Sequence, residues 1–350
     1  MRFTTLRRIG IATVAAGLFT TTLAACGEDA APAGKEGGIE RSADETLVLY
    51  SGRNEELVGP LIEQFTQETG IEVDVRYAGT TEQAALLLEE GANSPADVFL
   101  SQDAGALGLL SDAGMLVDLP EEITGAVMGD YSSQDGSWVG LTARARVIAY
   151  NGDKYDESEV PDNVAALTGP EWKGKVAFPP GNASFQSFVT GFRVAEGDDA
   201  AAAWLKGMVD NDFQSFEKNG DVLTAVDEGA VDLGLINHYY LYALIAEVGE
   251  ENVKAKLKFP KAGDPGALVN VTGAAVLSTH PDAIALVKFL VSKTGQEYFV
   301  NETHEYPVVE GINPPADLPA LADLKGPLED LSDLDDLEKS IQMIQDAGMS

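Results

Sequence analysis

The sequence predicts an α/β fold of two lobes with crossing strands and a ligand cleft between the lobes. Short apolar segments with strand character alternate with helical segments along most of the chain, an order typical of a largely parallel sheet covered by helices. The chain has 350 residues, more than one hydrophobic core usually organises. A long β-rich segment over residues 138–150 indicates a crossing between the lobes.

The first lobe is expected to begin with a strand over residues 47–50 and a helix over residues 55–67. Residues 71–77 alternate apolar and polar side chains, as a half-buried strand does. A helix over 81–90, a strand over 97–100 and a helix over 104–113 complete this part of the pattern. Ligands in such sheets bind beyond the carboxyl ends of the strands, so the turns after these strands are candidate sites.

The second lobe repeats this alternation. We expect a strand over residues 175–178, a helix after Phe185, helices around 200–209 and 222–228, and a strand over 231–236. Residues 272–278 suit a return crossing, and residues 334–347 have the spacing of an amphipathic helix. The predicted boundaries place residues 46–143 and 271–315 in lobe 1, and residues 144–270 and 316–350 in lobe 2.

The first 26 residues differ in composition from the rest. Three arginines precede an apolar run over residues 9–18, and small residues follow, the pattern of an export signal. The run Leu-Ala-Ala-Cys-Gly at residues 23–27 resembles a bacterial lipobox, which implies cleavage before Cys26 and a lipid on that residue. A generic secretory signal with an accidental cysteine is the alternative. Residues 27–45 are small and polar, so we expect a flexible tether.

Composition excludes several function classes. The 57 acidic and 23 basic residues give a formal net charge of −34, so nucleic acid is not an expected partner. Cys26 is the chain's one cysteine, which rules out an intramolecular disulfide. The sequence contains no nucleophile elbow, phosphate loop or His-rich metal motif. After the signal no apolar run reaches the roughly 18 residues of a membrane span. We therefore expect an exported, monomeric binding protein, anchored to the cell membrane by its lipid, rather than an enzyme.

The run Ile-Asn-His-Tyr-Tyr-Leu-Tyr at residues 236–242 concentrates phenols in a chain with only 10 tyrosines. Asn237 is a favoured helix N-cap, and an apolar helical stripe follows, which predicts Tyr239 and Tyr240 in the first helical turn, about 100° apart. Their oxygens then converge beyond a strand end. Phenolates are hard anionic ligands that suit Fe(III), although half-buried packing is the alternative. We expect His238 and Tyr242 to have structural roles.

From about residue 47 to its end, the chain resembles the periplasmic ferric-ion-binding proteins, the solute-binding components of iron ABC transporters. Several runs carry the resemblance through their order and spacing: LYSGR at 49–53, TGI at 69–71, SPADVF at 94–99, RARV at 144–147, NHYY at 237–240, DPGAL at 264–268, TGAA at 272–275 and EYP at 305–307. The resemblance implies Fe(III) bound in the cleft by Tyr239 and Tyr240. It also implies a synergistic anion such as carbonate or phosphate, and delivery of the iron to an ABC permease by a protein that itself faces the periplasm or cell exterior.

Other ligand positions depart from the family pattern. Asn54 and Gln102 stand where some members have a ligand histidine and glutamate, and Asn182 stands where other members have a third tyrosine. The anion would therefore carry more of the coordination, with Arg144 as its expected contact, whereas we expect Arg146 to be a strand-face or lobe-contact charge. Neutral donors available to the ligand are Asn182, Ala183, Ser184, Asn219 and Asn237. The alternative function is a binding protein of the same architecture for another solute, such as a sugar phosphate, thiamine or an organic anion.

Overall fold

The computed structural model describes residues 38–315, 318–324, 326–328 and 330–349. The predicted signal and Cys26 lie outside the described residues. No helix in the described part of the chain is long and apolar enough to cross a membrane.

Ten strands of the described residues form one mixed sheet in the order β2-β1-β3-β9-β4-β7-β5-β6, with β8 and β10 also paired to β4. The strands are β1 (Leu47–Ser51), β2 (Val73–Tyr77), β3 (Val98–Ser101), β4 (Trp138–Asn151), β5 (Val176–Phe178), β6 (Gln214–Ser215), β7 (Leu233–Asn237), β8 (Ala255–Lys258), β9 (Val269–Val276) and β10 (Tyr306–Pro307). The β1, β2 and β3 strands are parallel to one another, as are β5, β6 and β7, while β4 and β9 are antiparallel to their neighbours. Both parallel groups belong to the predicted α/β pattern.

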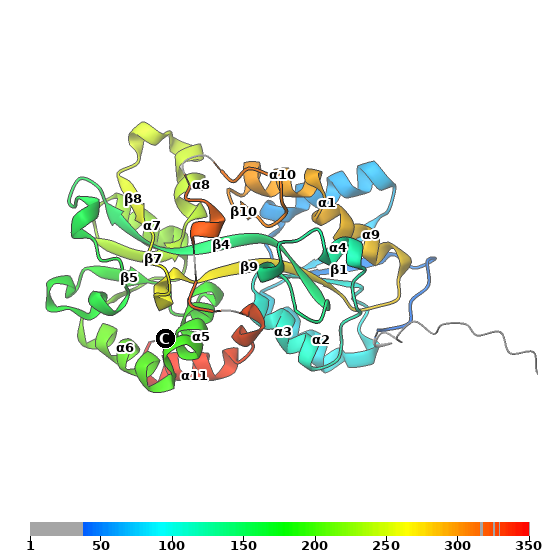
Figure 1. The fold of residues 1–350 in the computed structure, drawn as a ribbon, viewed down its shortest axis with the longest axis horizontal. Coiled ribbons are helices and arrows are strands. Elements are labelled where there is room, and N and C mark those ends of the chain that lie inside the picture. Colours follow the sequence, from blue (N-terminus) through cyan, green and yellow to red (C-terminus); the bar gives the residue numbers. More distant parts are fainter. Residues whose placement is uncertain (1–37, 316–317, 325, 329, 350) are drawn as a thin grey trace, which may run out of the picture. The chain divides into compact units, whose positions relative to one another are not determined.

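Helices cover the sheet (Figure 1). The α-helices are α1 (Glu55–Thr69), α2 (Thr80–Glu90), α3 (Ala104–Asp112), α4 (Glu121–Thr124), α5 (Ala183–Glu196), α6 (Asp198–Asp210), α7 (Asn219–Asp227), α8 (Tyr239–Val248), α9 (Pro281–Leu290), α10 (Lys293–Glu302) and α11 (Leu337–Asp346). The apolar spacing of α1 explains its packing, because Val58, Leu61, Ile62 and Phe65 are its buried residues. The predicted pattern of strands and helices is recovered to within a few residues, and α9 and α10 fill a region for which no element was predicted.

Strand β4 joins two groups of elements. Its residues up to Ala145 pair with β9, and from Arg146 onward it pairs with β7 and β8. Figure 1 shows β4 and β9 running between the group that contains α1, α2 and α9 and the group that contains α6, α7 and α8. The buried apolar side chains separate accordingly, with one large cluster around β1, β3 and β9 and two clusters around β5 and β7. This is the predicted two-lobed architecture, although the exact lobe boundaries stay a prediction.

Two local predictions differ from the structure. Asn237 is the last residue of β7, paired with Arg146 of β4, and the N-cap position of α8 belongs to His238. Strand pairing therefore extends one residue further than the helix-capping preference of asparagine indicated. The tether prediction does not hold for residues 38–45, because Ile39 bonds to the backbone of Leu277 and Arg41 donates to the carbonyl of Pro95 at 2.6 Å.

The C-terminal segment contacts elements of both groups. The 3-10 helix η9 (Leu331–Leu334) packs on α3 so closely that a Cβ on Gly105 would lie 2.3 Å from the carbonyl oxygen of Leu334. Helix α11 packs on α5, where Arg193 donates to the Ser340 hydroxyl at 2.8 Å. This segment therefore adds a further connection beside β4 and β9.

A buried ion cluster fastens the crossing strands to the loop after β1. Arg53 binds both carboxylate oxygens of Glu305, at 2.9 and 3.2 Å, and donates to the Thr272 hydroxyl of β9 at 2.8 Å. The Nε atom of Arg144 in β4 lies 3.6 Å from the same carboxylate, and Thr303 also donates to it. Burial alone would raise the pKa of Glu305, but the two guanidinium groups and these hydrogen bonds hold it below its usual value.

The substitution Glu305→Gln should therefore destabilise the protein strongly. It keeps the size of the side chain but leaves two buried guanidinium groups without a carboxylate, for which we expect a loss of about 3–5 kcal/mol in the free energy of unfolding near neutral pH. Chemical denaturation measures this loss.

The pH dependence provides a second measurement. A carboxyl group whose folded pKa is lowered stabilises the protein above its unfolded pKa, and this contribution disappears as the pH falls through the folded pKa. The difference between the wild type and Glu305→Gln should therefore shrink in acid. Glu302→Gln, at an exposed position of α10, is the control and should change stability by less than about 0.5 kcal/mol. Equal effects of the two substitutions would contradict the assignment of the cluster.

Candidate metal-binding site

Tyr239 and Tyr240 form a stacked pair at the start of α8, directly after β7. Their ring centroids are 4.4 Å apart with an interplanar angle of 27°. Tyr239 is buried, with 7% of its surface exposed, and Tyr240 is half-buried. The structure thus brings the two predicted ligand side chains together at the carboxyl end of a strand, where α/β sheets bind ligands.

The surroundings of Tyr239 decide its protonation. Burial, and then the neighbouring Tyr240 phenol, raise the pKa of Tyr239 far above its ordinary value, while Arg53 and Arg144 act in the opposite direction. The raising effects prevail, so the phenol is protonated in the metal-free protein. A metal ion that binds to its oxygen must displace this proton.

Arg144 retains hydrogen-bonding capacity at the centre of the site. Its Nη2 atom donates to the carbonyl oxygens of Gln102 and Val271, the latter at 3.2 Å. Its Nε and Nη1 atoms are buried and have no hydrogen-bond partner among the described residues. Buried N–H groups without a hydrogen-bond partner can bind an anion, which agrees with the expectation that Arg144 contacts the anion.

Arg146 also lies in the candidate site. From the sequence we expected only a charge on a strand face or at a contact between the lobes. It donates to Ser184 Oγ at 3.2 Å and to Asn237 Oδ1 at 3.5 Å, and its guanidinium lies over the rings of Phe185 and Phe188. No carboxylate of the described residues forms an ion pair with it, whereas Arg144 shares Glu305. Burial lowers the pKa of Arg146 to about 9, as expected for a desolvated cation without a counter-charge.

The neutral polar residues predicted for the site gather at the starts of two helices. Asn182 caps α5, and its Oδ1 atom accepts hydrogen bonds from Ser184 N at 3.0 Å, Ser184 Oγ at 2.7 Å and Asn219 Nδ2 at 3.2 Å. Asn219 opens α7, and its Oδ1 atom is buried without a partner among the described residues. Ala183 is the first residue of α5. Helix N-termini favour anions, so these residues and Arg146 form a positive wall.

The two remaining predicted contacts are less closely involved. Asn54 is exposed at the N-cap position of α1 and makes no capping bond with its side chain. Gln102 is half-buried, and its backbone accepts from Arg144 and donates to Thr80 Oγ1. The structure therefore places Gln102 beside the cluster, but it does not test whether either side chain contacts a ligand.

His238 is a fully hydrogen-bonded, buried residue, as predicted. Its Nδ1 atom accepts from Ala145 N at 3.2 Å, and its Nε2 atom lies 3.1 Å from the carbonyl oxygen of His304. Burial lowers the pKa of His238 to about 4, so the ring is neutral near neutral pH.

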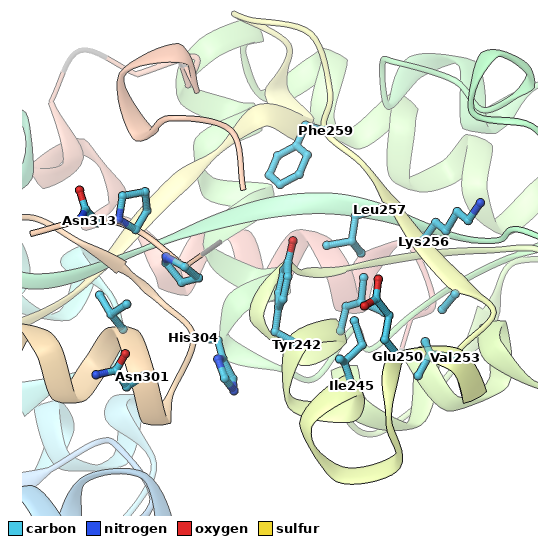
Figure 2. A pocket seen from close by; sticks show the side chains of 15 residues that line it. Tyr242, Ile245, Glu250, Val253, Lys256, Leu257, Phe259, Asn301, His304 and Asn313 are labelled. Atoms are coloured by element: carbon cyan, nitrogen blue, oxygen red, sulfur yellow. The ribbon is translucent and has the colours of Figure 1, made fainter. Parts of the chain in front are cut away.

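Tyr242 points into a different cavity, of about 780 Å³, which it lines together with Phe259 and His304 (Figure 2). The lining of this cavity includes neither Tyr239 nor Tyr240. The position of Tyr242 thus agrees with its expected separation from Tyr239 and Tyr240.

Few side chains of the site are available as metal ligands. Among the residues that the structure describes, no group of three or more His, Cys, Asp or Glu side chains is placed to hold a metal ion. Glu305 is already bound by two arginines. The phenols of Tyr239 and Tyr240 are therefore the hard oxygen donors that this site offers.

Comparisons with known proteins agree with this architecture. Residues 93–325 match the family described as bacterial extracellular solute-binding protein. An Fe(3+)-binding periplasmic protein of Serratia marcescens is 36% identical over 317 residues, which cover 89% of this chain and 93% of the relative.

Solved structures give the same result. The iron-bound HitA from Pseudomonas aeruginosa has a TM-score of 0.81 at 36% identity, and the match covers 87% of this chain and 99% of that one. A Trichodesmium protein (IdiA, FutA) in complex with iron and citrate has a TM-score of 0.73 at 29% identity, with 87% and 100% coverage. The chain belongs to the family of bacterial extracellular solute-binding proteins.

Proposed function

We propose that the protein captures Fe(III) in its cleft, together with a synergistic anion, and delivers it to an ABC permease. The observation that carries this proposal is the stacked pair of Tyr239 and Tyr240 beside three buried arginines, of which Arg53 and Arg144 share the carboxylate of Glu305. Two phenolates are the donors that Fe(III) favours, and the charges of Arg53 and Arg144 favour the anionic form of Tyr239. Relatives described as iron-binding support the choice of metal.

The charges also explain why an anion is needed. Glu305 offsets one of the three guanidinium charges of Arg53, Arg144 and Arg146, which leaves two positive charges beside the phenols. Two phenolates fill only part of an iron coordination shell. An anion bound by Arg144, or by Arg146 with Ser184, would supply further oxygen ligands and neutralise a buried cation. Carbonate and phosphate fit this role, and citrate joins them because a related protein holds iron with citrate.

We further propose that the protein acts as an exported, monomeric lipoprotein. Its anchor is a lipid on Cys26, and it faces the periplasm or cell exterior. The acidic composition, with a formal net charge of −34, gives no support to nucleic acid as a partner. The alternative solutes are a sugar phosphate, thiamine or an organic anion without iron, for which Tyr239 and Tyr240 would form a stacking surface.

Visible absorption tests the metal and its ligands. Protein without residues 1–26 should retain about one Fe(III) from a weak chelate and turn coloured, because charge transfer from phenolate to iron absorbs visible light. Tyr239→Phe and Tyr240→Phe keep the rings but remove the donor oxygens. Loss of a residue that only supports a metal ligand usually lowers metal affinity by about 10–100-fold. Each of these substitutions removes a ligand itself, so each should lower iron affinity by more than this and shift or abolish the visible band.

Tyr242→Phe is the matched control and should leave the band unchanged, because Tyr242 lines the separate cavity. A band that is indifferent to all three substitutions would reject the tyrosine site. Retention of another metabolite without iron, measured by equilibrium dialysis, would instead favour the alternative solute.

The anion is tested by iron titrations with and without bicarbonate, phosphate or citrate. We expect each effective anion to strengthen iron retention, and Arg144→Ala to weaken it by about 10–100-fold, because a charge-assisted hydrogen bond contributes roughly 1.5–3 kcal/mol. Arg193→Ala also removes a buried arginine, but one that binds α11, and should leave iron affinity unchanged. Equal affinity in anion-free and anion-containing buffer would contradict an anion-completed site.

Acid should discharge the metal. Burial raises the pKa of Tyr239, so iron must displace its proton, and a second proton leaves if Tyr240 also binds as phenolate. Affinity should therefore fall as the pH falls, by up to about 100-fold per pH unit for two protons. A pH-stat measures the protons released per iron bound, and a value below one would show that Tyr239 does not bind as phenolate.

A further inference from the structure

We infer that His238 is a positioning residue for iron capture, which ties the start of α8, and so the tyrosine pair, to the segment before β10 through its hydrogen bond to the His304 carbonyl. This inference rests on the proposed function of Tyr239 and Tyr240. His238 directly precedes Tyr239, and its ring has no exposed surface. It therefore acts on the metal site through the backbone of α8 and not as a ligand.

The hydrogen bonds of His238 fix both the tautomer and the orientation of its ring. Because Nδ1 accepts from the backbone N–H of Ala145, the ring proton resides on Nε2, which donates to the carbonyl of His304. The ring also packs edge-on against Tyr239, at a centroid distance of 5.9 Å and an angle of 89°, and at a tilt of 45° against Tyr306, at 4.9 Å. These contacts leave the ring a single orientation.

The acceptor of this bond has an unusual backbone. His304 has φ = 57°, in the left-handed region that non-glycine residues seldom adopt. Such a conformation is unfavourable for a residue with a side chain and persists where the surroundings enforce it. The next residue, Glu305, is held by Arg53. The left-handed turn lets the carbonyl of His304 reach His238 while the carboxylate of Glu305 reaches the arginines.

A continuous chain of bonds therefore connects the loop after β1 to the tyrosine pair. It runs from Arg53 to the carboxylate of Glu305, through the backbone to the His304 carbonyl, and through His238 to Tyr239. Arg53 belongs to the element group of α1, whereas His238 belongs to that of α8. Movements of one group relative to the other, which accompany closure in two-lobed binding proteins, would reach the phenols through the bond from His238 to His304.

Two substitutions of His238 each remove one of the two hydrogen bonds of its ring and keep the other. In His238→Asn, the amide oxygen takes the place of Nδ1 and still accepts from Ala145, but the donor to His304 is lost. In His238→Gln, the amide nitrogen takes the place of Nε2 and still donates to His304, but the acceptor for Ala145 is lost. Each variant loses one buried hydrogen bond, so a purely structural role predicts similar losses of stability and no change at the metal.

The experiment measures thermal unfolding, iron affinity and the visible band of the wild type and both variants. We expect His238→Asn to weaken iron affinity by about 10–100-fold, the usual effect of an outer-shell partner, and to shift the band. His238→Gln should stay within about threefold of the wild type. Unchanged affinity and band in both variants would overturn the inference, and so would a larger effect of Gln than of Asn. A wild type that shows no iron band would instead reject the proposed function.

His280 provides a matched control. It is buried and has the same bonding pattern, since Nδ1 accepts from Asp282 N at 3.2 Å and Nε2 lies 2.9 Å from the carbonyl of Glu45. His280→Asn should lower stability without altering the band. If His238→Asn does not fold, His304→Gly tests the same link, because glycine accepts the positive φ but releases the direction of the carbonyl. Its iron affinity should fall about tenfold or more, and unchanged affinity would overturn the inference.

Discussion

The carboxylate of Glu305, buried between Arg53 and Arg144, is the interaction on which the rest of the cleft depends. Taking these charges out of water is unfavourable, and this cost is offset because the carboxylate accepts hydrogen bonds from Arg53 and Thr303 and forms an ion pair with Arg144. The same contact joins the loop after β1, the crossing strand β4 and the segment before β10. A simple apolar contact would hold these elements together without leaving a positive charge in the cleft.

That charge contrasts with the rest of the molecule. The chain is strongly acidic, yet the candidate site contains three buried guanidinium groups, the starts of α5 and α7, and one carboxylate. An acidic exterior attracts cations in general, whereas a positive interior selects a cation only when its ligands are anionic. Phenolates and a bound anion would meet this condition, so the proposed site would favour the metal as a complex with its anion over a bare divalent ion.

The sequence was sufficient for the local elements and for the tyrosine pair, because apolar periodicity and a rare cluster of phenols after a strand are local signals. It was insufficient for Arg146 and Glu305, whose roles depend on the register of β4 against β7 and on a contact with Arg53, 252 residues away in sequence. One signal was available: Arg144 and Arg146 are two residues apart in a strand and so share a face, which would have placed both at the site. The prediction that Asn237 caps α8 was wrong because Asn237 pairs with Arg146 and so continues strand β7.

The lowered pKa of Arg146 has a consequence for binding. Burial destabilises the charged form of Arg146, and an anion bound beside the guanidinium would stabilise it again. Anion binding would therefore offset part of the desolvation free energy of this side chain. In the proposed site, the same anion would also coordinate the iron that is bound to the phenolates. The two solutes would then raise each other's affinity by the same factor, as thermodynamic linkage requires. The proposed site, with two tyrosines as its iron ligands, would thus bind iron tightly when the anion is present and release the iron when the anion leaves.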